Sequence, residues 1–358
     1  MRRGLKLEIG GDLKPEEVTE YSSLRFQFSS LSSMFSFRPY RRVFRQPLRT
    51  AHGLWSVREG FIVRCEQGGQ VGFGEVAPLP DFGTETVSAA AEFLQQLTEN
   101  PDLTVPAELP CCAFGVSAAG RGACPQASAD GDDGWLGAAV PTFSRSDIAA
   151  LLPAGATAES ILLEKAAAGY RSFKWKIGVE AVAEELPIFQ RLLAGLPKGG
   201  RLRLDANAGL SLNEAAGWLD SIVAARAQVE FLEQPLAVGQ EHKMAAMMEG
   251  FEMPIALDES LNGASGSKWL AEWQGPVVVK PLLMGDCVQL AERLQSIADR
   301  VVLSSVFETA VGVRNVARIT AQLPALNYAI GFDTANAFED NLNTSEPEAV
   351  WNALHHSN

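Results

Sequence analysis

Short runs of β-forming residues recur through the last two thirds of this chain at a regular spacing of about 22 to 29 residues. Helical patterns fill most intervals, for example the segment that follows a capping box at Ser211 and Glu214. Strands that alternate with helices favour parallel βαβ units, and eight such strands close a TIM barrel. The eight runs are 150–154, 172–177, 201–206, 229–233, 254–258, 277–280, 301–305 and 327–331. An open doubly wound sheet is the alternative, but the chain has no GxGxxG phosphate loop to support it. We therefore predict an α/β fold with a (β/α)8-type barrel.

The first third of the chain has a different pattern. Residues 37–76 alternate apolar and polar positions around glycine-rich turns, which predicts antiparallel strands. Residues 84–99 carry an apolar stripe typical of a helix, and the Gly-, Asp- and Ala-rich stretch 120–137 predicts a flexible loop. This part is therefore expected to be α+β.

These patterns suggest a division into domains. We predict an α+β domain over residues 34–140, a barrel over 141–335, and a C-terminal segment, 336–358, that packs back on the first domain. Strand-like patterning begins only after Met34, so residues 1–33 are expected to form a dispensable extension.

Composition excludes several classes of partner. The net charge of −13 disfavours nucleic acid and anionic membrane surfaces, but it leaves room for a small anionic substrate bound by local cations. No apolar run reaches the roughly 20 residues that a membrane span requires. The five cysteines are odd in number and form no CxxC pair, which argues against a zinc or disulfide framework and favours the cytoplasm. The sequence does not distinguish a monomer from a homo-oligomer.

Acidic residues stand at the carboxyl ends of three successive predicted strands, where a barrel places its active site. Asp205, Glu233 and Asp258 are 28 and 25 residues apart, about one βα unit each. A single acidic residue at a strand end is most often a helix cap or a solvated loop residue, but the joint placement of all three argues for a shared role. Converging carboxylates need a cation between them, and oxygen ligands favour Mg²⁺, with Mn²⁺ as a substitute.

Lysines flank these carboxylates on both sides. Lys174 and Lys176 are two residues apart on one predicted strand and so share a face, and Lys280 ends a later strand. A neighbouring ammonium group disfavours protonation, so one lysine of the pair can act as a base near neutral pH. We expect Lys176 to be that base because it lies nearer the carboxyl end, with Lys174 lowering its pKa.

The charged positions occur within recognisable motifs: "KWK", "DAN", "EQP", "DES" and "VVVKP". Together they resemble the muconate-cycloisomerase-like group of the enolase superfamily over about residues 37–335, with the first domain corresponding to the capping domain. Further motifs resemble the o-succinylbenzoate synthases of menaquinone and phylloquinone biosynthesis. These are "GFGEVAPLPDFGTET", "RLDAN", "VLSSVFETAVG" and "GFDT".

The resemblance implies a lyase that dehydrates a succinyl-bearing hydroxycyclohexadiene carboxylate to an aromatic product. Lys176 would remove the proton next to the carboxylate and return a proton to the departing hydroxide on the same face. Lys280 would stabilise the enediolate as a cation, and Asp205, Glu233 and Asp258 would bind Mg²⁺.

The resemblance also implies a substrate pocket. Its candidate contacts are Arg203, Asn207, Ser304 and Ser305. Capping-domain residues would cover this pocket and exclude water. They are His52, Gly53, Leu54, Pro80, Phe82 and Gly83.

The same catalytic parts also serve other reactions. N-acylamino acid racemases and dipeptide epimerases use a lysine on each face of the substrate, so the reaction stays open between these and the synthase. An epimerase would be expected to carry an Asp-x-Asp pair near the last strand, where this chain has Asp333 and then Asp340. A non-catalytic binding protein on the same fold would be expected to have lost some of these carboxylates and lysines. A zinc hydrolase would be expected to carry histidines directly after barrel strands.

Overall fold

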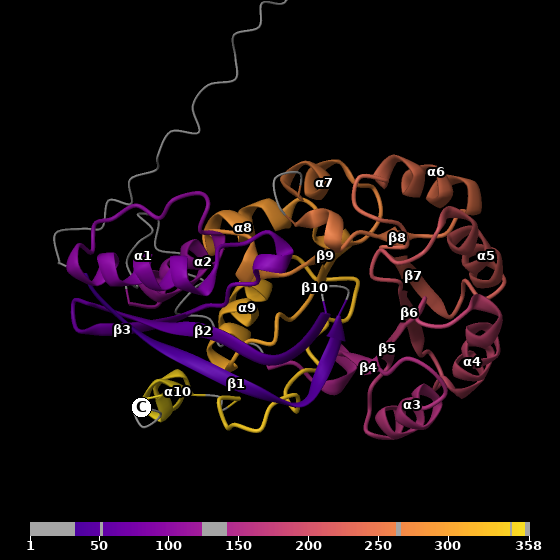
Figure 1. The fold of residues 1–358 in the computed structure, drawn as a ribbon, viewed down its shortest axis with the longest axis horizontal. Coiled ribbons are helices and arrows are strands. Elements are labelled where there is room, and N and C mark those ends of the chain that lie inside the picture. The colour runs from indigo at the N-terminus through magenta and orange to yellow at the C-terminus, as the bar shows by residue number, and fades with distance from the viewer. Residues whose placement is uncertain (1–32, 51–52, 124–141, 263–265, 344–345, 355–358) are drawn as a thin grey trace, which may run out of the picture.

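The computed structural model describes residues 33–50, 53–123, 142–262, 266–343 and 346–354. The extension 1–32, most of the predicted loop 120–137 and His52 lie outside these ranges. Figure 1 shows two parts that lie next to each other: a three-stranded sheet with its helices, and a barrel.

The first domain is an antiparallel sheet covered by two helices. Its strands, β1 (Met34–Thr50), β2 (Gly53–Gln67) and β3 (Gln70–Val76), pair in that order. Helix α1 (Val87–Glu99) begins at Thr86, whose side chain accepts a hydrogen bond from the backbone of Ala89. This agrees with the predicted helix. Helix α2 (Pro110–Ala123) extends into the predicted loop, so residues 120–123 are helical and that part of the loop prediction is wrong.

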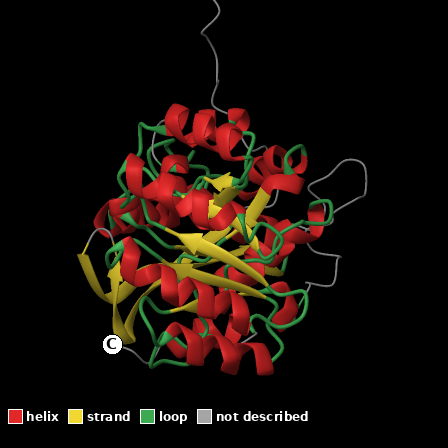
Figure 2. Cartoon of the chain, turned by 90° about the vertical axis from the view of Figure 1, so that its right-hand side faces the viewer, coloured by secondary structure: helices red, strands yellow, loops and turns green. Residues whose placement is uncertain are grey.

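Seven short strands form most of the barrel wall. They are β4 (Ala149–Leu152), β5 (Ser172–Lys176), β6 (Arg201–Asp205), β7 (Val229–Glu233), β8 (Ile255–Ala256), β9 (Val277–Val279) and β10 (Val301–Leu303). All their pairings are parallel. A helix follows each one, and Figure 2 shows these helices around the strands. They are α3 (Ala158–Ala167), α4 (Val182–Gly195), α5 (Leu212–Val223), α6 (Glu241–Phe251), α7 (Gly266–Glu272), α8 (Cys287–Gln295) and α9 (Ala310–Gln322).

Isolated bridges close the barrel. Leu257 pairs with Val277 between β8 and β9, and Gly331 and Ile330 link Ser304 on one side to Ile148 on the other. The predicted barrel is therefore confirmed, but its eighth strand, expected over 327–331, consists of single-residue bridges. A short polar turn follows this position, so the described part of the chain gives the eighth position no outer helix of its own.

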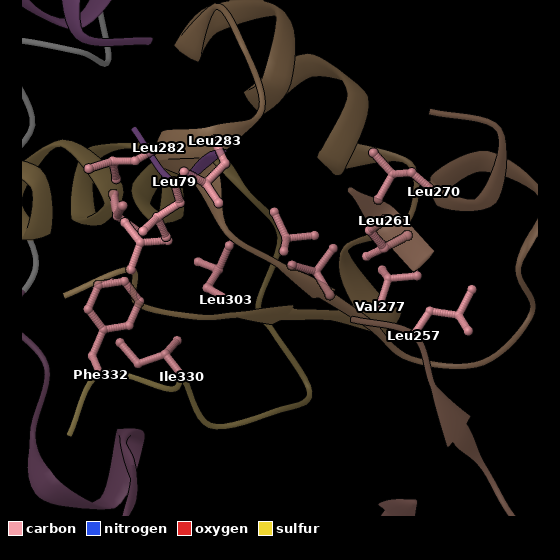
Figure 3. Close-up of a cluster of buried hydrophobic side chains, with 14 of the residues drawn as sticks. Leu79, Leu257, Leu261, Leu270, Val277, Leu282, Leu283, Leu303, Ile330 and Phe332 are labelled. Carbon is pink, nitrogen blue, oxygen red and sulfur yellow. The ribbon is translucent and has the colours of Figure 1, made fainter. Parts of the chain in front are cut away.

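The core has an outer and an inner layer. Outside the strands, the buried rings of Trp175 and Trp218 pack edge to face, with their centres 6.2 Å apart. Inside the barrel, a smaller cluster comprises Phe231, Ala256, Val278 and Val302, with Tyr328 against it. Leu79 of the capping domain lies beside Leu282 and Leu283 of the barrel (Figure 3), so apolar contacts join the two domains.

The C-terminal helix α10 (Pro347–Ala353) lies against the first domain's sheet. The guanidinium of Arg38 stacks 4.0 Å from the ring centre of Trp351 and donates a hydrogen bond to its carbonyl oxygen. The domain boundaries themselves stay a prediction. Among the described residues, no helix has both the length and the apolar character needed to span a membrane.

Candidate active site

Strand register brings three of the predicted residues to one level of the barrel. Lys176 of β5 lies opposite Asp205 of β6, and Asp205 lies opposite Glu233 of β7. Asp258 follows β8, and Lys280 follows β9, next along the wall. The sequence predicted this grouping because the carboxyl ends of parallel strands meet at one end of a barrel.

Lys174 bonds to two of the carboxylates. Its Nζ atom lies 2.8 Å from Asp205 Oδ2 and 2.6 Å from Glu233 Oε1. Burial lowers the pKa of Lys174, but the negative charges of Asp205, Glu233 and Asp258 outweigh burial and hold the pKa well above its usual value. Lys174 therefore stays protonated in this arrangement.

The third carboxylate, Asp258, forms a buried ion pair with Lys280. The ring of Phe82 lies on the same lysine, with its centre 5.1 Å from Nζ. Phe82 belongs to the capping domain, in the short helix η1 (Pro80–Phe82), and the ring of Trp55 packs against it. The capping domain thus reaches the barrel site at this point.

The carboxylates are crowded. Burial and the charge of Asp205 raise the pKa of Glu233, while Lys174 lowers it. Among the residues that the structure describes, no three His, Cys, Asp or Glu side chains converge on one point, and the carboxylates instead bond to Lys174 and Lys280. Buried carboxylates that disfavour one another's ionisation have the donor chemistry of a site for a hard divalent cation, so the residues fit Mg²⁺.

Asn207 supports two of the acidic residues. Its backbone N–H donates to Asp205 Oδ1 at 2.9 Å, and its side-chain amide donates to Glu259 Oε1 at 3.3 Å. The backbone of Asn207 is left-handed, with φ of 43°, which asparagine tolerates better than most residues. The hydrogen bonds of Asn207 therefore go to the acidic residues Asp205 and Glu259.

Arg203 lies one layer below, opposite Lys174 in the strand register. An irregularity in the pairing of β6 with β7 leaves Glu230 without a paired partner, and Arg203 Nε donates to Glu230 Oε2 at 2.5 Å. The guanidinium carbon is 5.1 Å from the ring centre of Phe231. The structure thus places Arg203 in the packed barrel interior, beneath the layer of carboxylates.

The two serines have different surroundings. Ser304 is half-buried and pairs with Gly331. The hydroxyl of Ser305 is buried, donates to Glu308 Oε2 at 2.8 Å and accepts from the backbone N–H of Phe307. Ser305 therefore supports the loop after β10.

Two buried glutamates that the prediction missed order the surrounding loops. Glu185 accepts hydrogen bonds from the backbone of Gly178, Val179 and Glu180, which begin two residues after Lys176. Glu75 accepts from Thr309 and Gly312 at the start of α9 and joins the capping domain to the loop after β10. Glu75 lies inside the quoted motif "GFGEVAPLP", which was the available signal.

The remaining predicted capping residues lie in two places, at η1 and at the start of β2. Pro80 begins η1, and Gly83 ends it with a left-handed φ of 79°. Gly53 starts β2 at the hairpin turn, and Leu54 is 63% exposed. Phe82, between Pro80 and Gly83, contacts the predicted catalytic residue Lys280.

Comparisons with known families match both parts of the chain. Residues 157–348 match the family described as "Enolase C-terminal domain-like", and residues 48–122 match "MenC, N-terminal domain". The first match corresponds to the barrel and the second to the capping sheet and its helices.

Individual proteins similar to this chain are o-succinylbenzoate synthases. The o-succinylbenzoate synthase of Thermosynechococcus vestitus is 35% identical over 289 residues, which cover 77% of this chain and 85% of that protein. The synthase of Aliivibrio fischeri is 28% identical and covers 82% and 91%.

Solved structures give the same result. The Thermosynechococcus elongatus synthase with Mg in its active site superposes with a TM-score of 0.75 at 31% identity and covers 89% of this chain and 99% of that one. A dipeptide epimerase of Enterococcus faecalis, at 16% identity and a TM-score of 0.69, covers 88% and 95% and shares the fold. The chain belongs to the o-succinylbenzoate synthase family of the enolase superfamily.

Proposed function

We propose that this chain catalyses the Mg²⁺-dependent syn dehydration of a succinyl-bearing hydroxycyclohexadiene carboxylate to o-succinylbenzoate. The observation that carries the proposal is the register of Lys176, Asp205 and Glu233 at one level of the barrel, with the Asp258–Lys280 pair next along the wall. Family membership supports the same reaction.

Asp205, Glu233 and Asp258 would hold the metal. Mg²⁺, or Mn²⁺ in its place, withdraws charge from a bound substrate carboxylate and makes the neighbouring proton easier to remove. The carboxylates are almost fully buried and come from three neighbouring positions of the barrel wall, which suits a hard ion that also accepts substrate and water oxygens.

Lys176 would act as the base. It stands at the end of β5 beside Asp205, so a substrate carboxylate near the acidic cluster would bring its α-proton within reach. The same ammonium group can then give its proton to the departing hydroxide, which leaves as water from the same face. One residue thus performs both transfers, as a syn elimination requires.

Lys174 and Lys280 would supply positive charge. Lys174 is held protonated by Asp205 and Glu233, and it shares a face of β5 with Lys176. Lys280 projects from the far side of the acidic cluster and would stabilise the enediolate charge. Phe82 covers Lys280, Trp55 packs against Phe82, and together they would limit the access of water.

The surroundings of the last barrel position disfavour the epimerase alternative. Asp333 accepts hydrogen bonds from Lys165 and Tyr170, and Asp340 forms an ion pair with Arg42. Both carboxylates are thus engaged by this chain's own groups and are not arranged to receive a dipeptide ammonium. An N-acylamino acid racemase remains the alternative to be tested.

The test follows the ultraviolet absorbance of the cyclohexadiene substrate with the purified chain in Mg²⁺ and then in EDTA. Rapid loss of the diene band that EDTA abolishes and Mg²⁺ restores is the expected result. A chain that binds Mg²⁺ but leaves the diene intact, while exchanging deuterium into N-succinyl amino acids, would replace dehydration with racemisation. The quinone pathway is a prediction from the family, and the cytoplasmic location is a prediction from the cysteine content.

A further inference from the structure

The side chain of Gln234, directly after Glu233, is fully buried and uses all of its hydrogen-bonding capacity. Its oxygen accepts from the backbone N–H groups of Asp258 at 3.0 Å and Ser260 at 3.2 Å. Its nitrogen donates to the carbonyl of Leu236 at 3.0 Å and to the hydroxyl of Ser260 at 2.8 Å. Two acceptor and two donor positions are all that a primary amide offers.

The backbone of Gln234 makes two further links. Its N–H donates to the carbonyl of Ala256 at 2.8 Å, and its carbonyl accepts from the N–H of Ala208 at 2.7 Å. The residue has a left-handed φ of 34°, an uncommon conformation for glutamine that the surrounding bonds hold in place. Gln234 therefore joins the ends of three successive strands, each of which carries one of the three carboxylates.

Contacts of Ser260 and Glu241 orient the amide of Gln234. The hydroxyl of Ser260 donates to Glu241 Oε1 at 2.7 Å, and the same carboxylate oxygen accepts from the backbone N–H of Gly239. Ser260 is fully buried and Glu241 is 3% exposed. Reversing the amide would turn its nitrogen toward two N–H donors, so only one orientation satisfies every group.

We propose that Gln234 is a positioning residue that sets the affinity of the site for Mg²⁺ by holding Asp258 in register with Glu233. The inference rests on the proposed function in one respect, namely that these carboxylates bind the metal. Gln234 touches no reacting atom, and its effect passes through the backbone of Asp258. Groups that orient metal ligands typically change metal affinity when they are removed.

The test compares Mg²⁺ binding to the metal-free full chain by titration calorimetry. Gln234→Met keeps the side chain's length and removes all four hydrogen bonds, and it should weaken Mg²⁺ binding by about tenfold. Saturating Mg²⁺ should then restore most of the turnover. Gln228→Met is the matched control, because Gln228 donates to the carbonyl of Leu193 away from the carboxylates. This control should bind Mg²⁺ like the wild type.

Ser260→Ala provides a milder variant should Gln234→Met not fold. It removes only the hydroxyl between the amide and Glu241 and should weaken Mg²⁺ binding severalfold. Wild-type affinity in a folded Gln234→Met or in Ser260→Ala would overturn the inference. Asp258→Asn distinguishes the metal assignment from the role of Gln234. If Asp258→Asn leaves Mg²⁺ affinity unchanged, the metal assignment fails. If Asp258→Asn weakens Mg²⁺ binding but the Gln234 and Ser260 variants do not, only the role of Gln234 is refuted.

Discussion

The ring centre of Phe82, in the capping domain, lies 5.1 Å from Nζ of Lys280, at the end of a barrel strand. Lys280 is almost fully buried and ion-paired with Asp258, so an aromatic face is one of the few surfaces on which its charge is favourable. The contact links the capping domain to the placement of a proposed catalytic cation.

Replacing Phe82 tests this coupling. Phe82→Leu keeps an apolar cover but removes the ring, and we expect kcat to fall about tenfold, since a desolvated cation–π contact contributes about 1–2 kcal/mol. Phe82→Tyr keeps the aromatic face and should retain most of the activity. Steady-state rates of diene loss measure both variants, and equal rates for Leu and Tyr would show that only the apolar cover matters.

Lys176 is the proposed base, and Lys176→Ala should abolish turnover while leaving the fold intact. The residue lies at the strand end beside Asp205, and no other lysine occupies its register position. Circular dichroism and Mg²⁺ titration should match those of the wild type. Lys198→Ala, on an exposed loop, is the matched control and should be fully active. Substantial diene loss by Lys176→Ala would move the base to another residue.

Glu308 makes the stability of the folded chain depend on pH. Burial raises the pKa of this carboxyl to about 7, and the nearby charge of Glu75 adds to the rise. The folded chain therefore holds the proton more tightly than the unfolded chain does. The resulting stabilisation is fully present below the ordinary pKa of 4.5 and is lost as the pH rises through about 7.

Glu308→Gln removes this titration. Between pH 5 and pH 8 the wild type should lose up to about 3 kcal/mol of unfolding free energy relative to the variant, at 1.36 kcal/mol per pKa unit. Urea denaturation at both pH values measures the difference. The exposed Glu339→Gln serves as control and should follow the wild type. Parallel stability curves for wild type and Glu308→Gln would contradict the raised pKa.

Glu75 is the buried carboxylate that fixes the capping domain to α9. It accepts from the hydroxyl of Tyr40, from the backbone and hydroxyl of Thr309 and from the backbone of Gly312. In Glu75→Gln an NH₂ group would face N–H and O–H donors, and we expect the unfolding free energy to fall by about 3 kcal/mol. Glu59→Gln, whose side chain is 52% exposed, should change it little. A thermal midpoint for Glu75→Gln equal to that of Glu59→Gln would refute this role.

Local patterns predicted most of the fold. The capping box at Ser211 and Glu214 starts α5 as expected, because both of its hydrogen bonds join residues three apart. The strands around Lys174 and Asp205 were found because side-chain alternation is a property of neighbouring residues. The predictions failed at residues 120–123, where a Gly- and Ala-rich segment continues helix α2.

The tertiary structure decided the environment of individual side chains. Arg203 shares a face with Asp205, as the alternation predicts, but an irregularity in the neighbouring strand gives it Glu230 as an ion-pair partner. Ser305 likewise bonds to Glu308, which depends on how the loop after β10 turns. Neither contact has a signature in residue spacing, because each depends on a pairing shift or a loop conformation.

The sequence by itself predicted the barrel, and it placed Asp205, Glu233, Asp258 and the lysines at the carboxyl ends of the barrel strands. Strand periodicity and the common direction of parallel strands are sufficient for those conclusions. Only the tertiary structure decided which lysine bonds to which carboxylate, and that Gln234 and Glu75 hold the site and the capping domain in place. These contacts join segments distant in the chain, and their geometry depends on packing between elements rather than on the local pattern.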